Sequence, residues 1–80
     1  MTEVEALELV ESKRDKLEID SEMEQDSAVK AIVEYKKKPS SPGKTEDRIA
    51  WVVTYTSAMG YVQVHVDDKS GKILAVQRSA

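Results

Sequence analysis

His65 is the one histidine of the chain, and two carboxylates, Asp67 and Asp68, follow it closely. Imidazole and carboxylate groups together are the material of metal sites and of acid and base pairs. A strand would place His65 and Asp67 on the same face, but one imidazole with turn carboxylates supplies too few ligands for zinc. We therefore interpret His65 as a sheet-surface histidine and predict no metal site and no cofactor.

Hydroxyl nucleophiles are available, but nothing in the sequence activates them. A serine hydrolase needs a base, and any serine would depend on the same single histidine. No serine stands in a glycine-flanked elbow, and no glycine-rich phosphate loop is present. Clustered glutamates near the start are explained as the solvated face of a helix. We expect no catalytic residues. The groups considered are Ser12, Ser27, Ser57, Ser70, Glu3, Glu5, Glu8 and Glu11.

The composition favours one small folded domain spanning residues 1–80. Eighty residues with 40% hydrophobic content can form a single core, and the absence of cysteine leaves burial of apolar side chains as its main support. A net charge of −3 argues against nucleic-acid binding, which requires a basic face. No stretch is long and apolar enough to insert into a membrane, and the acidic start lacks the regions of a signal peptide.

The first 17 residues carry the signature of a helix. Thr2 followed by Glu5 is a capping-box spacing, and acidic residues precede basic ones as the helix dipole favours. Apolar residues then recur at helical spacing, which predicts a helix over about 3–17. The next stretch, residues 21–27, has no apolar period and is expected to be loop or fraying helix. The recurring apolar residues are Val4, Leu7, Val10 and Leu17.

Residues 28–37 fit two periods at once, a helical stripe and a strand alternation, and their β-branched content favours a strand. Residues 39–47 hold two prolines, Pro39 and Pro42, and a glycine, which predicts a flexible loop. Strands follow at about 48–56, 61–67 and 72–78, where apolar and polar residues alternate. The fold class is therefore α+β, with the N-terminal helix packed on an antiparallel sheet of three to four strands.

The last turn of the sheet has a distinctive composition. Asp67, Ser70 and Gly71 can bond turn amides and supply a positive φ between two strands. Residues 64–73 resemble the signature of the PepSY domain family, in which a strand ends in Val-Asp and resumes after Ser or Thr and Gly. Residues 50–55 look like the preceding strand of that family. The resemblance covers residues 49–76.

The resemblance implies a helix on an antiparallel sheet, a non-enzymatic role, a secreted or periplasmic location, and binding or restraint of a peptidase. We therefore expect a protein-interaction domain whose partner is another protein, with a peptidase as the implied class. The candidate contact residues are Met59 and Tyr61 at a hairpin tip and Pro42 and Lys44 in the loop. The alternative is a small structural or envelope-associated domain that pairs through a sheet edge.

Overall fold

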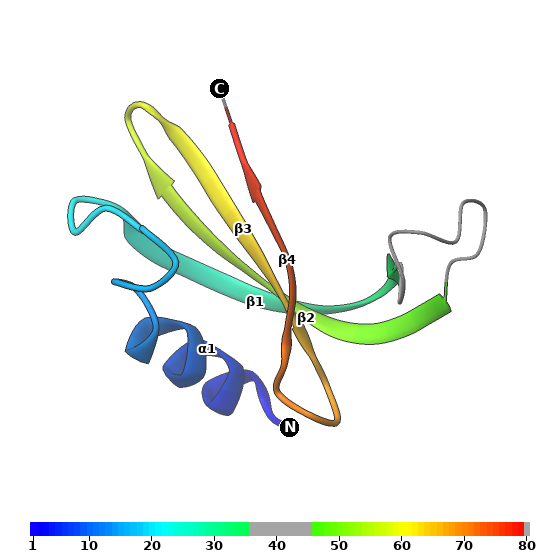
Figure 1. Ribbon diagram of the computed structural model, residues 1–80. Helices are drawn as coiled ribbons and strands as arrows, with labels where there is room; N and C mark the ends of the chain where they lie inside the picture. The colour runs from blue at the N-terminus through cyan, green and yellow to red at the C-terminus, as the bar shows by residue number, and fades with distance from the viewer. Residues whose placement is uncertain (36–45, 80) are drawn as a thin grey trace.

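The computed structural model describes residues 1–35 and 46–79, and it is an α+β fold (Figure 1). One helix, α1 (Glu3–Ser12), precedes four strands: β1 (Glu24–Tyr35), β2 (Glu46–Ser57), β3 (Gly60–Asp67) and β4 (Ile73–Arg78). The strands form one antiparallel sheet in the order β1-β2-β3-β4. α1 lies against one face of this sheet, so the predicted arrangement and the larger of the two predicted strand numbers are confirmed.

α1 begins as predicted and ends early. The Thr2 hydroxyl accepts the Glu5 amide, and the Glu5 carboxylate accepts the Thr2 amide, which completes a capping box. The helix stops at Ser12 instead of near residue 17, and the chain continues in turns. In these turns the Arg14 guanidinium donates to the backbone carbonyls of Asp20 and Met23. These turns reverse the chain and bring Ile19 into the core.

β1 starts earlier than the sequence indicates. Residues 28–35 are a strand, which resolves the ambiguous period, but residues 24–27 belong to it as well instead of forming loop or fraying helix. Glu24 and Gln25 pair with the end of β2, and the register then shifts between Gln25 and Ala28. This β-bulge lets an otherwise polar stretch join the sheet while the apolar residues after it keep their own face.

The predicted loop at 39–47 is also shorter at its far end, since Glu46 and Asp47 already belong to β2. They pair with the last residues of β1, and antiparallel pairing extends the strand beyond the run of alternating apolar residues. Residues 36–45 lie outside the described part of the chain, and with them Pro42 and Lys44.

The core lies between α1 and one face of the sheet. Ala6 and Val10 are fully buried on the helix, and they meet side chains from three strands, as the alternation in β2 and β3 predicts. Val4 does not join them and is exposed, because the buried stripe of α1 is centred on Ala6 and Val10. The sheet residues that belong to this core are Ala28, Val53, Tyr55, Val62, Val64 and Val66.

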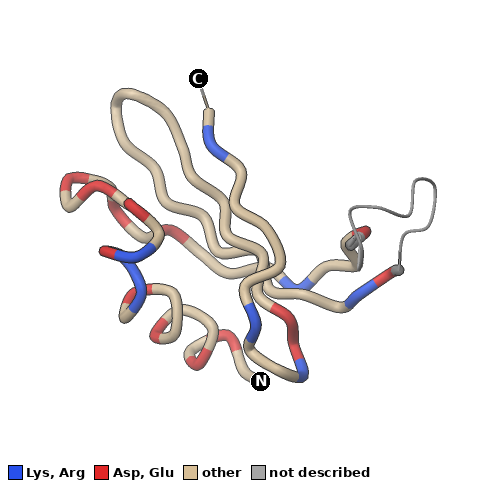
Figure 2. The backbone as a smooth tube through the Cα atoms, in the orientation of Figure 1, with Lys and Arg blue, Asp and Glu red and all other residues tan. Residues whose placement is uncertain are grey.

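Charged residues lie mainly along α1, the connection after it and the strand ends (Figure 2). The central parts of β2 and β3 carry few of them, in agreement with their burial. Within residues 1–35 and 46–79, no helix has the length and apolar character needed to span a bilayer.

Candidate functional site

The turn between β2 and β3 presents the most exposed large apolar side chain of the described residues. Met59 is 90% exposed at this tip, and Tyr61, the next residue but one, is 44% exposed. Both were predicted as contact residues, and the sheet places both at this end of the molecule (Figure 1).

The tip is held in place by Ser79, the residue that follows β4. The Tyr61 amide donates to the Ser79 hydroxyl at 2.8 Å, and the Ser79 amide donates to the Tyr61 carbonyl at 3.0 Å. Gly60 adopts φ 149°, and a Cβ there would stand 2.1 Å from the Ser79 oxygen. The positive φ favours glycine at this position, and the bonds to Ser79 hold the turn that presents Met59.

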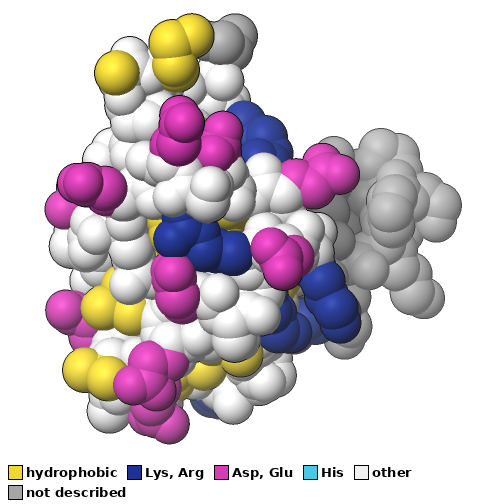
Figure 3. All heavy atoms as spheres, turned by 90° about the vertical axis from the view of Figure 1, so that its left-hand side faces the viewer, with side chains coloured by type: hydrophobic (Ala, Val, Ile, Leu, Met, Phe, Trp, Pro, Cys, Tyr) yellow, Lys and Arg dark blue, Asp and Glu magenta, His cyan; other side chains and the backbone are white. Residues whose placement is uncertain are grey.

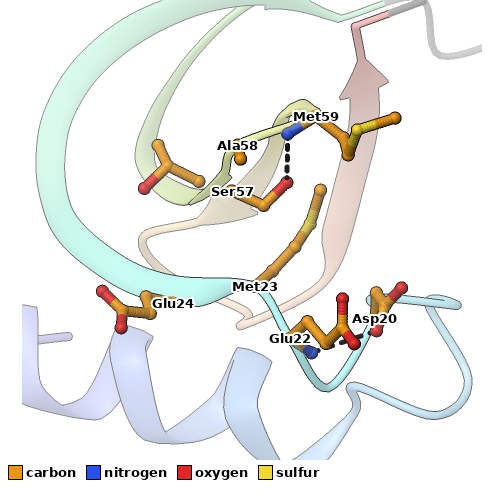
Figure 4. A pocket seen from close by; sticks show the side chains of 8 residues that line it. Asp20, Glu22, Met23, Glu24, Ser57, Ala58 and Met59 are labelled. Atoms are coloured by element: carbon orange, nitrogen blue, oxygen red, sulfur yellow. Dashed lines mark hydrogen bonds between the residues drawn. The ribbon is translucent and has the colours of Figure 1, made fainter.

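A groove of about 540 Å³ runs beside this tip (Figure 4). Its floor and walls come from two places far apart in the sequence: the chain entering β1, and the β2–β3 turn. Met23 points from the first of these toward the second, so that its thioether faces the turn that carries Met59 (Figure 4). The lining residues are Asp20, Glu22, Met23, Glu24, Thr56, Ser57, Ala58 and Met59.

The groove is acidic. Three carboxylates, those of Asp20, Glu22 and Glu24, are among its lining residues, and none of the described lining residues is a lysine or an arginine. Hydrophobic side chains stand above acidic ones on this end of the molecule (Figure 3). Such a combination attracts a cationic group and offers an apolar contact next to it, and methionine adapts readily to the shape of a partner.

Arg14 fixes the wall that carries these carboxylates. Its guanidinium donates to the backbone carbonyls of Asp20, at 2.7 Å, and Met23, at 2.5 Å. It also donates to the Glu11 carboxylate at 2.8 Å and lies 5.1 Å from the centre of the Tyr55 ring. The backbone of the connection between α1 and β1 is thus tied to both the helix and the sheet.

Tyr55 sits at the centre of this network. Its hydroxyl donates to the Glu11 carboxylate at 2.7 Å and accepts from the Gln25 amide at 2.9 Å. Burial and the adjacent Glu11 carboxylate raise the pKa of Tyr55 to about 12. The bonds from Arg14 and Tyr55 lower the pKa of Glu11. The network was not foreseen, because its partners come from α1, β1 and β2.

The turn after β3 uses Asp67, Ser70 and Gly71. Asp67 is 2% exposed, and its carboxylate accepts the Ser70 amide at 2.8 Å and the Ser70 hydroxyl at 2.9 Å. These bonds, with the nearby Arg48 guanidinium, hold the pKa of Asp67 below its usual value. Gly71 donates to the Asp67 carbonyl with φ 73°, in the left-handed region that glycine tolerates. All three residues have a structural task.

His65 is half-buried on the sheet face opposite α1, with Val52 and Ala75 as its cross-strand neighbours. Burial among these side chains lowers the pKa of His65. In the described ranges, His, Cys, Asp and Glu side chains do not gather in threes as metal ligands. Asp68 faces a different group from His65: it accepts the Trp51 indole N–H at 2.8 Å.

Sequence reasoning found the exposed tip but not the groove beside it. Met23 and its acidic neighbours were expected to be loop or fraying helix, and only the pairing of Glu24 with Thr56 brings them next to the tip. The one sequence feature that pointed to the groove was a methionine, Met23, within an acidic run. This feature does not show which residues lie next to Met23 in the folded sheet.

We compared the chain with models of protein families, with curated proteins and with solved structures, and none of the three comparisons found a match.

Proposed function

We propose that this chain is a non-catalytic protein-binding domain that contacts its partner through the β2–β3 tip and the acidic groove beside it. The observation that carries the proposal is Met59, 90% exposed at a tip that Ser79 holds in place. An apolar side chain kept in solvent on a fixed turn is typical of a contact residue.

The groove defines the chemistry of the partner. Its carboxylates favour lysine or arginine, and Met23 and Met59 favour an apolar side chain next to that cation. The partner segment therefore combines a basic residue with an apolar one. Since exposed charges are screened by salt, its affinity falls as ionic strength rises.

From the resemblance of residues 49–76 to the PepSY family, we infer that the partner is a peptidase. The domain binds or restrains this peptidase outside the cell. The resemblance implies a helix packed on an antiparallel sheet, and the chain has this arrangement. The cross-strand neighbours of His65 are Val52 and Ala75, and we propose a non-enzymatic role for the domain.

A peptide library displayed on phage tests the surface directly. We expect the full chain to select peptides with a basic residue beside an apolar one, and the substitution Met59→Asp to weaken binding of a selected peptide by about tenfold or more. Val4→Asp is the matched control, because Val4 is also an exposed apolar residue but lies on α1, and it leaves the affinity unchanged. Fluorescence anisotropy gives both dissociation constants.

Equal effects of the two substitutions would refute the proposed surface. A separate assay tests whether the partner is a peptidase. The chain is titrated into serine, cysteine and metallopeptidases, and inhibition of each is measured. Stoichiometric inhibition that Met59→Asp relieves is the expected result. Absence of inhibition and of binding across all three classes would remove the peptidase and leave the peptide-binding surface standing.

A further inference from the structure

β1 forms one edge of the sheet, and its second half is suited to pairing with another strand. After the bulge, residues 28–35 pair with β2 in continuous register. On their other side, no strand of the described chain is bonded to them. Ile32 is 73% exposed and Val29 is 59% exposed. A long, regular edge with exposed apolar side chains is a template for strand addition.

The opposite edge differs. β4 has six residues, and its Arg78 guanidinium donates to the backbone carbonyls of Leu17 and Glu18, so that the turns after α1 are tied to this strand. The edge of β1 is therefore the longer and the more open of the two.

We propose that residues 30–34 of β1 pair antiparallel with the same residues of a second copy of this chain, about a two-fold axis at Ile32. This inference rests on a different surface from the proposed partner site. It joins two four-stranded sheets edge to edge, with the same patch used by both copies, as in an isologous dimer.

Charge complementarity selects the second copy as the occupant. Lys30 and Glu34 lie on the same face of β1, two positions on either side of Ile32. With the axis at Ile32, Lys30 of each copy stands opposite Glu34 of the other, which gives two attractive cross-strand pairs. Parallel in-register pairing would place like charges side by side, and an antiparallel shift by two residues would place a charge against Ile32.

The same register matches the apolar residues. Ile32 meets Ile32 of the second copy, and Ala31 meets Val33 on the other face. Within each copy, Ile32 already stands opposite Ile49 of β2, which is half-exposed. The dimer thus extends an exposed pair of isoleucines into an apolar row across both sheets, which removes these side chains from water.

Glu34 gains most from the pairing. Its cross-strand neighbour on β2 is Asp47, so two like charges stand opposite each other in the single chain. Lys30 is half-exposed, and its 3.8 Å contact with the Asp68 carboxylate is a long surface ion pair. Its ammonium also lies 5.8 Å from the centre of the Trp51 ring, so a turn toward Glu34 of the second copy exchanges these two contacts for the new pair.

Sedimentation velocity of the full chain across concentrations tests the proposal. We expect a monomer–dimer equilibrium, and Glu34→Lys to weaken dimerisation by about tenfold or more because it turns both attractive pairs into repulsive ones. The fold of this variant is not at risk, since the substitution removes the repulsion with Asp47. Glu8→Lys, the same charge change on an exposed helix position, leaves dimerisation unchanged.

Mixing two variants gives a sharper test. Lys30→Glu and Glu34→Lys each repel themselves, but together they restore both attractive pairs, so an equimolar mixture forms a heterodimer that native mass spectrometry detects. A monomer at all concentrations up to about 1 mM would overturn the proposal. So would a dimer that Glu34→Lys and Glu8→Lys weaken equally, or a mixture of the two variants without heterodimer.

Discussion

At the scale of single residues, the structure is held by a few polar side chains that join elements distant in the sequence. Tyr55 is the main example, because one hydroxyl links Glu11 of α1 to Gln25 of β1. The Gln25 amide donates to the Leu7 carbonyl as well. The ring of Tyr55 is buried while its hydroxyl satisfies charged and polar partners, which gives helix docking a defined position.

Replacing Tyr55 by phenylalanine removes these hydrogen bonds and keeps the ring. We expect Tyr55→Phe to lower the free energy of unfolding by about 1 to 3 kcal/mol, since one lost partner is a carboxylate. Urea denaturation followed by circular dichroism measures the loss. Tyr61→Phe is the control at an exposed tyrosine, with an expected change within about 0.5 kcal/mol. Equal losses in both variants would contradict the role of the network.

Asp67 should make the free energy of unfolding depend on pH in the acidic range. Hydrogen bonds from Ser70 lower its pKa in the folded state, so the stability that its charge contributes is complete above its unfolded pKa, near 3.8, and is lost as pH falls through the lower folded value. We expect Asp67→Asn to cost about 1 to 3 kcal/mol at pH 7. The difference in the free energy of unfolding between this variant and wild type becomes smaller below about pH 4.

Urea denaturation at pH 7 and pH 3 checks this expectation. Asp26→Asn is the matched control, because Asp26 is exposed on β1, and it should have little effect at either pH. If the difference in the free energy of unfolding between Asp67→Asn and wild type stayed constant down to pH 2, the charge of Asp67 would not be the source of its contribution to stability.

At the scale of elements, α1 is short and depends on the sheet. A ten-residue helix is marginal alone, so its stability comes from burying one stripe against the strands. That stripe is narrow, with Ala6 and Val10 fully buried and Leu7 and Leu9 partly so. Val10 and Val4 therefore differ greatly in their contribution to the free energy of unfolding.

Val10 and Val4 make this difference measurable. Val10→Ala removes two buried methyl groups and leaves a small cavity, for an expected loss of about 2 kcal/mol in the free energy of unfolding. Val4→Ala removes the same atoms from an exposed position, where alanine is the better helix former, and should change it by less than about 0.5 kcal/mol. Similar values for the two would mean that the helix does not pack on the sheet as described.

At the scale of the whole molecule, the two proposed contact surfaces lie at different ends of the sheet. The tip with Met59 closes one end of β2, and Ile49, opposite Ile32, lies near its other end. Figure 1 shows the β2–β3 turn and the far ends of β1 and β2 on opposite sides of the molecule. The chain can therefore pair with a second copy while the tips remain open.

Substitutions at one surface should leave the other intact. We expect Glu34→Lys to weaken dimerisation and to keep the affinity for a peptide that binds at the tip. Met59→Asp should do the opposite, because no residue is shared between the two surfaces. For each of the two variants, sedimentation velocity gives the dimer dissociation constant and fluorescence anisotropy gives the peptide dissociation constant. Loss of both properties in either variant would show that the surfaces are coupled or that the variant is misfolded.

Local patterns in the sequence determined much of this fold. The capping box at Thr2 depends on a spacing of three residues, and the turn at Asp67 and Gly71 depends on one side chain and one backbone angle. The alternation of Val62, Val64 and Val66 places every second residue in the core whatever the neighbouring strand is. These features were readable because each is complete within a few residues.

Tertiary contacts decided the rest. α1 ends at Ser12 because Arg14 binds carbonyls of the next connection and Ile19 enters the core, and neither contact can be read from helical spacing. The groove exists because strand register brings Met23 to the tip that carries Met59. Ile32 meets Ile49 for the same reason. A pattern specifies which face a residue takes, whereas only the folded sheet specifies which residue lies across from it.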